Sequence, residues 1–429
     1  MERRSDGIGT GTSRPEQRSQ STERERTEMI KVLHTADLHV GWENYSRPTD
    51  QGLSSCLMAF RDTLDEITEI AVEEAVDLVV IAGDLYKMRD PSQTYQSIVA
   101  EFIAEISRDR GIPVVIVPGN HDLPGNPTKA STLDVFDVLE AKNVTILGGK
   151  PELSRIQTRS GHIVVAPLPW IRPADLQDAD SLATAYQTIA RQLANEAGSM
   201  MLVDTPIRPP AILVGHLTVA NARPGSEAGM MLGKDPIIPV RELARPEFDA
   251  VMLGHIHNGQ VFDDQYPVVA YCGSPQALDF SDEGDQKHVL IWQIEKGCTT
   301  FKDVPLITTR RFQTVNVEID GLFTTPDSVK WWPFDTETVT GKIIRVNVTV
   351  PKHLASQVDN NAIHEALKGA AWVQINKRVL QDNAPVRDVA ALAGMSPMQA
   401  LEKYCQDKTL TPGFDKAVLE AAAVLMKGE

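Results

Sequence analysis

The stretch Ala250-Val251-Met252-Leu253-Gly254-His255-Ile256-His257 joins an apolar run to a pair of histidines. The apolar residues predict a buried strand, and Gly254 allows the chain to turn tightly after it. His255 and His257 are two positions apart, and alternate residues of an extended chain point to the same side. The stretch therefore predicts a strand that ends in two imidazoles facing one site.

Four further polar clusters also follow predicted strands. They are Asp37-Leu38-His39 after strand 30–35, Gly83-Asp84 after 78–82, Gly119-Asn120-His121-Asp122 after 113–117, and Gly215-His216 after 211–214. Each cluster alone is weak evidence, because Asp is common in turns and a single His is usually structural. In layered α/β folds, however, ligand sites lie beyond the carboxyl ends of strands. The five clusters together therefore predict one metal site.

The candidate ligands combine carboxylates, imidazoles and one amide oxygen, a set that suits Mn, Fe or Zn better than Ca. Their number fits two ions. Two metals roughly 3.5–4 Å apart can clamp the attacking and leaving oxygens of a phosphoryl group. A hydroxide shared by the metals is a nucleophile at neutral pH, so the site needs no serine or cysteine nucleophile.

The order of the predicted elements indicates an α/β fold. Short apolar runs alternate with helical patterns such as 54–76 and 92–108, which predicts layers around a central sheet. Further strands at 312–319 and 343–350 predict a smaller α/β unit, and the pattern is helical from 386 onward. We expect four segments: a disordered tail over 1–28, a main domain over 29–311, a small α/β domain over 312–385 and a helical segment over 386–429.

Composition excludes several classes of protein. The first 28 residues are too polar to fold alone and lack the pattern of a secretory or transit signal, so Met29 is a candidate start. No apolar run approaches the roughly 18 residues of a membrane span. We therefore expect a cytoplasmic protein that does not bind membranes. The net charge of −16 excludes nucleic-acid binding by bulk charge alone, although bound metals can reverse the charge locally.

Two further motif classes are absent from the sequence. The four cysteines form no CxxC pair, which argues against a zinc knuckle or a disulfide framework. There is also no GxxxxGK[ST] phosphate loop, so we expect no ATP hydrolysis by this chain itself.

The motifs DxH, GD, GNHD, GH and GHxH resemble those of the calcineurin-like metallophosphoesterase superfamily. The resemblance implies a layered α/β metallophosphoesterase sandwich with two metals. It assigns one metal to Asp37, His39 and His257, the other to Asn120, His216 and His255, and the bridging position to Asp84. It implies that His121 acts as a general acid or phosphate donor. Asp122 would orient His121, or would be a plain turn residue.

A narrower resemblance is to the SbcD family of DNA-repair nucleases. It rests on the opening stretch 33–41 and on Gly273-Ser274-Pro275 followed by 278–287. It implies a manganese-dependent 3′–5′ exonuclease on duplex ends and single-strand endonuclease, with a capping domain over 312–385. It also implies a homodimer that acts on DNA with an SbcC-type coiled-coil ATPase. Lys87 departs from the pattern, because many relatives carry a His there, and this bears on the balance of the two activities.

Several alternatives remain open at this point. Helices 54–76 and 92–108 would form a dimer bundle or pack on their own sheet, and the C-terminal helices would dock on the ATPase or pack on the capping domain. A phosphoesterase for a small nucleotide or cyclic nucleotide would share all five motifs. A scaffold with a dead phosphoesterase fold would have lost ligands, and this sequence has lost none.

Overall fold

The computed structural model describes residues 29–49, 52–126, 128–172, 182–200, 208–229, 235–319 and 336–380, with a few positions after 395. The predicted tail over 1–28 lies outside the described residues, as does nearly all of the predicted helical segment over 386–429. The chain divides into two compact units. The first unit comprises 1–315, 334–345 and 367–374, and the second comprises 316–333, 346–366 and 375–429.

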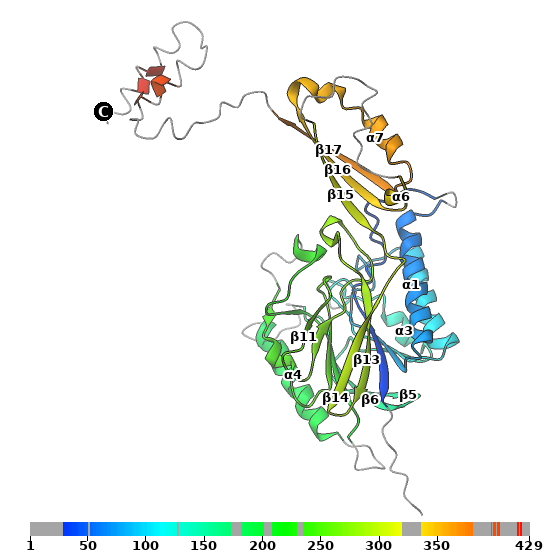
Figure 1. The fold of residues 1–429 in the computed structure, drawn as a ribbon. Helices are drawn as coiled ribbons and strands as arrows, with labels where there is room; N and C mark the ends of the chain where they lie inside the picture. Colours follow the sequence, from blue (N-terminus) through cyan, green and yellow to red (C-terminus); the bar gives the residue numbers. More distant parts are fainter. Residues whose placement is uncertain are drawn as a thin grey trace, which may run out of the picture. The chain divides into compact units, whose positions relative to one another are not determined.

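Two six-stranded sheets form the body of the first unit (Figure 1). The first sheet has the order β14-β13-β1-β2-β3-β4. Its strands are β1 (Ile30–Thr35), β2 (Leu78–Ile81), β3 (Val114–Ile116), β4 (Val144–Ile146), β13 (His288–Glu295) and β14 (Cys298–Pro305). Strands β1 to β4 are parallel, and the β13–β14 hairpin pairs antiparallel with β1.

The second sheet has the order β11-β12-β10-β7-β6-β5. Its strands are β5 (Ser154–Thr158), β6 (Gly161–Leu168), β7 (Ala211–His216), β10 (Ala250–Gly254), β11 (Gln260–Phe262) and β12 (Val269–Tyr271). The four inner strands are parallel, and β5 and β11 are antiparallel edges. A short parallel pair, β8 (Thr218–Val219) with β9 (Ile237–Ile238), follows β7.

The two sheets face each other across one apolar core. Val32 and Val80 of the first sheet lie in the same buried cluster as Ile212 and Met252 of the second. Leu33 alternates with Val32 and points to the opposite face, as the period of a strand requires. The fold is therefore an α/β sandwich with two sheets. The strand–helix alternation alone indicated one central sheet, because it cannot assign strands to sheets.

Helices cover the outer faces of both sheets. Helix α1 (Ser55–Glu73) begins where the Ser54 side chain accepts a hydrogen bond from the Leu57 N–H, and it is followed by α2 (Gln93–Ala104). The apolar faces of both helices belong to the core on the outer face of the first sheet. Helix α4 (Leu182–Ser199) covers the second sheet in the same way. Helices α1 and α2 thus pack on their own domain, which was one of the two expectations.

The predicted strands near the C-terminal part of the chain are present. They form a three-stranded sheet of β15 (Phe312–Glu318), β16 (Ile343–Pro351) and β17 (Trp372–Leu380), with α6 (Thr336–Val339) and α7 (Asn360–Ala366) nearby in sequence. Within the second unit, the amides of Asn316, Asn347 and Asn376 form a hydrogen-bonded row across this sheet. The predicted domain boundary at 312 stays a prediction.

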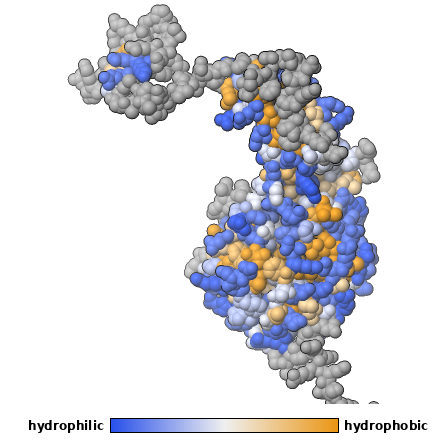
Figure 2. Space-filling model, in the orientation of Figure 1, coloured by the Kyte–Doolittle hydropathy of each residue, from blue (hydrophilic) through white to orange (hydrophobic). Residues whose placement is uncertain are grey.

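The surface of the first unit is mixed in character. Figure 2 shows hydrophilic residues over much of the visible face, with hydrophobic residues gathered in patches. Helix α3 (Asp134–Val138) has a notable apolar exposure, since Val135 is 48%, Val138 80% and Leu139 72% exposed. Among the described helices, none has the length and apolar character needed to cross a membrane.

Candidate metal centre

The nine predicted site residues all follow strands of the sandwich. The loops after β1, β2 and β3 of the first sheet supply Asp37, His39, Asp84, Asn120, His121 and Asp122. The loops after β7 and β10 of the second sheet supply the histidines: β7 ends at His216, and His255 and His257 follow Gly254. The seven predicted metal ligands include six that are buried. The site thus lies where the carboxyl ends of the two sheets meet.

The backbone at this site takes an unusual conformation. Asp37, His39, Asp84 and His255 have positive φ angles of 54°, 46°, 55° and 94°. Residues with a Cβ rarely adopt this region, and each such residue costs on the order of 1–3 kcal/mol. Four candidate ligands thus share a strained backbone, which is typical of functional sites.

Close packing explains the glycines of two motifs. A Cβ added to Gly119 would collide with the carboxylate of Asp84, and one added to Gly83 would collide with the ring of His216. Gly83 also has a φ of +89°, which a residue with a side chain rarely adopts. These glycines let the loops after β2 and β3 approach each other and the second sheet.

One cluster of ligand atoms consists of Asp37, His39 and His257, whose donor atoms all lie within 4.8 Å of one another. The Nε2 atoms of His39 and His257 are only 2.9 Å apart. Burial lowers the pKa of His39 to about 3, and burial also holds the pKa of His257 well below its ordinary value. Both rings are therefore neutral, as metal ligands must be. Nδ1 of His39 has no hydrogen-bond partner among the described residues.

The second cluster consists of Asp84, His216 and His255, again with donor atoms within 4.8 Å. Nδ1 of His216 donates a hydrogen bond to the carbonyl oxygen of Ala82 at 2.8 Å. Its Nε2 lies 3.4 Å from Oδ2 of Asp84 and 3.1 Å from Oδ1 of Asn120. Since Nδ1 carries the proton of the neutral ring, three electron-pair donors converge at this point.

Such a convergence needs a positive charge at its centre. Burial lowers the pKa of His216, but the carboxylate of Asp84 outweighs burial and raises this pKa to about 9. A proton on His216 is one solution, and a divalent ion is the other. Oδ2 of Asp84 also lies 3.8 Å from Nε2 of His39, so this carboxylate contacts both clusters. The donor set therefore fits two divalent ions joined at Asp84.

His121 lies beside the clusters and belongs to neither. Its Nδ1 donates to the carbonyl oxygen of Lys87 at 2.7 Å, and its main-chain N–H donates to Oδ1 of Asp84 at 2.8 Å. The ammonium group of Lys87 lies 3.9 Å from the centre of the Trp42 ring, which is a cation–π contact. The ring of His121 is thus oriented by a main-chain carbonyl.

Asp122 has a different environment from the one expected. Its carboxylate accepts hydrogen bonds from the main-chain N–H groups of Asp84 (2.7 Å), Leu85 (2.9 Å) and Gly119 (3.0 Å). These three bonds direct the carboxylate towards the backbone and not towards the ring of His121. Asp122 therefore joins the loops after β2 and β3, which is closer to the structural alternative than to an orienting role for His121.

A small pocket of about 80 Å³ opens onto the clusters. Its walls include His39, Asp84, His121 and two acids that the sequence analysis missed, Glu227 and Asp235. Glu227 belongs to the short helix η3 (Ser226–Gly229), and Asp235 precedes β9. Neither residue directly follows a predicted strand, so the pattern that found the other residues could not find these two.

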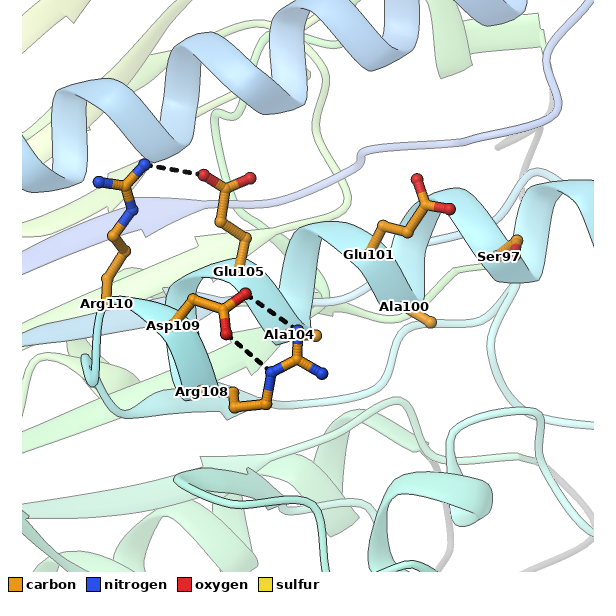
Figure 3. Close-up of a pocket in the computed structure, with 8 residues that line it drawn as sticks. All are labelled: Ser97, Ala100, Glu101, Ala104, Glu105, Arg108, Asp109 and Arg110. Carbon is orange, nitrogen blue, oxygen red and sulfur yellow. Dashed lines mark hydrogen bonds and ion pairs between the residues drawn. The ribbon is translucent and has the colours of Figure 1, made fainter.

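Another hollow of about 630 Å³ lies on the outer side of α2 and the π-helical turn Glu105–Asp109 that continues it (Figure 3). Its charged residues pair with one another: Arg110 with Glu105 at 2.9 Å, and Arg108 with Asp109 at 2.8 Å. This surface holds none of the predicted site residues. Its self-paired charges do not suggest a catalytic site.

The geometry agrees with the comparisons to known proteins. The calcineurin-like phosphoesterase family matches residues 30–259, which is more than half of the chain, and the chain belongs to this family. The family implies bound divalent metal ions, in line with the two clusters.

Within that family, the chain is similar to several bacterial proteins that are each named as the SbcD component of the SbcCD nuclease. The Escherichia coli K12 protein is 26% identical over 279 residues, covering 62% of this chain and 66% of the relative. The Bacillus subtilis protein is 27% identical over 282 residues, covering 62% and 67%. The Rhodobacter capsulatus protein is 28% identical over 308 residues, covering 65% and 69%. The matches thus span about two thirds of the length of these relatives.

Proposed function

We propose that this phosphoesterase is a DNA nuclease that hydrolyses phosphodiesters in DNA repair or recombination. The observation that carries the proposal is the complete donor set, in which Asp84 contacts both clusters. The similarity to the SbcD component of the SbcCD nuclease, over about two thirds of those relatives, selects DNA as the substrate. Manganese is the proposed metal, with 3′–5′ exonuclease activity on duplex ends and endonuclease activity on single strands.

The residues divide the work as follows. Asp37, His39 and His257 would hold one ion, Asn120, His216 and His255 the other, and Asp84 both. The ions would supply Lewis-acid polarisation of the phosphodiester and an activated water. Nδ1 of His121 is engaged by the Lys87 carbonyl, so only Nε2 remains for the substrate. When protonated there, His121 donates a proton to the leaving oxygen or a hydrogen bond to the phosphate.

We propose that 29–311 form the nuclease domain, 312–385 a capping domain, and 386–429 a helical segment for docking an SbcC-type ATPase. The ATPase proposal is supported by the name of the relatives, which are components of a larger nuclease. It also fits the absence of a phosphate loop from this sequence. Co-purification of the two chains, lost when 386–429 are removed, would support this docking site.

A homodimer is also proposed, and the structure suggests where to look for it. The apolar faces of α1 and α2 are used within the domain, whereas Val135, Val138 and Leu139 are exposed on α3. Contiguous exposed apolar side chains are typical of protein interfaces. Val138→Arg should shift the mass in solution from dimer to monomer. Ile307→Arg is the matched control, because Ile307 is 74% exposed elsewhere in the domain.

The decisive experiment is digestion of end-labelled duplex and single-stranded DNA with manganese. Wild type should degrade both, and Asp84→Asn should degrade neither. Asp264→Asn, an exposed aspartate outside the site, is the matched control. Hydrolysis of a small cyclic nucleotide without DNA cleavage would instead favour the small-substrate phosphoesterase. Tight metal binding without hydrolysis of either substrate, even with the ATPase present, would contradict both enzyme proposals.

A further inference from the structure

The two histidines of the stretch 254–257 are each contacted by a carboxylate from the region between β8 and β9. Glu227 contacts His257, and Asp235 contacts His255. Both acids line the pocket of the metal centre, and neither belongs to the two clusters of ligand atoms. Their positions behind the imidazoles raise the question of which ring nitrogen each histidine presents to a metal.

For His257, the partners of Nδ1 decide the answer. Nδ1 lies 2.7 Å from Oγ of Ser226 and 3.4 Å from Oε2 of Glu227. A hydroxyl group either donates or accepts a hydrogen bond, so Ser226 alone permits both tautomers, whereas an ionised carboxylate only accepts. A negative charge beside Nδ1 therefore favours a proton on Nδ1 and leaves the lone pair on Nε2. That Nε2 is the atom that lies 2.9 Å from Nε2 of His39.

Glu227 is held firmly enough for this role. It is buried, and its Oε1 accepts from the N–H of Gly225 at 2.9 Å. Its Oε2 accepts from the main-chain N–H of His257 at 3.1 Å. The carboxylate thus contacts both the backbone and the ring of the same histidine, which fixes the ring relative to its own strand end.

For His255, the same argument gives the opposite nitrogen. Nε2 of His255 lies 3.3 Å from Oδ2 of Asp235. The carboxylate favours a proton on Nε2, so the lone pair is on Nδ1. The backbone of His255 is fixed separately, because its N–H donates to both oxygens of Asp37, at 3.0 and 2.9 Å.

We propose that Glu227 and Asp235 are positioning residues that set opposite tautomers in the two histidines. His257 would then bind its metal through Nε2 and His255 through Nδ1. The inference rests on the metal centre of the proposed function, but it concerns the metal-free protein as well. A carboxylate behind a histidine ligand orients the ring and raises its basicity, and its loss typically weakens metal binding by about 10–100-fold.

The test begins with the metal-free protein labelled with ¹⁵N in histidine. Long-range ¹H–¹⁵N spectra should show His257 protonated at Nδ1 and His255 at Nε2. Glu227→Gln should shift His257 towards the Nε2–H form and weaken one manganese site by about 10–100-fold in calorimetric titration. Asp235→Asn should act in the same way on His255 and on the other site. Ser226→Ala should leave the tautomer of His257 unchanged.

Matched controls are Glu196→Gln and Asp264→Asn, two exposed acids away from the site, which should bind two manganese ions as wild type does. Wild-type His257 protonated at Nε2 would overturn the role of Glu227, even if Glu227→Gln failed to fold. Unchanged tautomers and affinities in both variants would overturn the whole proposal. Correct tautomers and two bound manganese ions without DNA cleavage would contradict the proposed function and leave this inference standing.

Discussion

The two sheets of the sandwich contribute different chemistry to the metal centre. Among the predicted ligands, loops of the first sheet supply both carboxylates and the amide, together with one imidazole, whereas loops of the second supply only imidazoles. Each cluster nevertheless draws on both sheets: Asp37 and His39 meet His257, and Asp84 meets His216 and His255. Neither sheet alone could assemble a three-ligand site.

This difference has a physical consequence for apo and metal-bound states. Without a metal, the second cluster can neutralise Asp84 with a proton on His216, whose pKa is raised to about 9. The first cluster has no such solution, because His39 and His257 are both held neutral by burial. Metal ions would therefore link the sheets at two points whose local charge differs when the ions are removed.

The largest effect should come from the residue that both clusters share. Asp84→Asn should remove both ions and reduce DNA cleavage by more than about 10³-fold, since metal ions stabilise the transition state by several kcal/mol. Metal content after dialysis and initial rates of cleavage provide the measurement. Asp264→Asn should behave as wild type. Full manganese occupancy in the Asp84 variant would break the assignment of a shared ligand.

The next effect separates chemistry from metal binding. His121→Asn should retain both ions, because His121 belongs to neither cluster, but should slow cleavage by about 10²–10⁴-fold, as expected for a lost acid. Rates at saturating DNA and metal content in the same sample would check this. A loss of metal would show that His121 is a ligand of one cluster and would redraw the comparison between the sheets.

A smaller effect concerns stability. One site occupied at 100 times its dissociation constant stabilises the fold by about 2.7 kcal/mol, so manganese should raise the melting temperature and a chelator should reverse the change. His257→Ala and His216→Ala should each retain roughly half of this stabilisation, because each removes a ligand from one cluster. Thermal unfolding with and without manganese measures it. Equal manganese stabilisation in wild type and in both variants would argue against two separate sites.

Much of this architecture could be predicted because the inner strands are continuously apolar. Strand β1 has the predicted bounds, and the inner strands β2, β3, β7 and β10 lie within two residues of theirs. The edge strands β5, β11 and β14 escaped, because their exposed faces carry polar residues that resemble loops. The assignment of strands to two sheets was also beyond reach, since it depends on long-range pairing.

The candidate site shows the same limit. Residues that directly follow a strand could be identified from their position, and the structure brings them together around two clusters. Glu227 and Asp235 could not, since they reach His257 and His255 from a region defined only by tertiary packing. The direction of a side chain was equally hidden: the sequence placed Asp122 beside His121, but its carboxylate turns to the N–H groups of Asp84, Leu85 and Gly119.

The smallest expected effect tests whether the apolar core, and not the metals, holds the sheets together. Ile212 of β7 lies in the core between the sheets, where it is fully buried. Ile212→Val should lower the free energy of unfolding by about 0.5–1.5 kcal/mol and the melting temperature by roughly 1–5 °C. Because the ligands themselves are unchanged, manganese affinity should stay at the wild-type value. If this one-methylene change instead weakened manganese binding tenfold, the sheet spacing would control the ligand geometry, and the clusters would be coupled through the core.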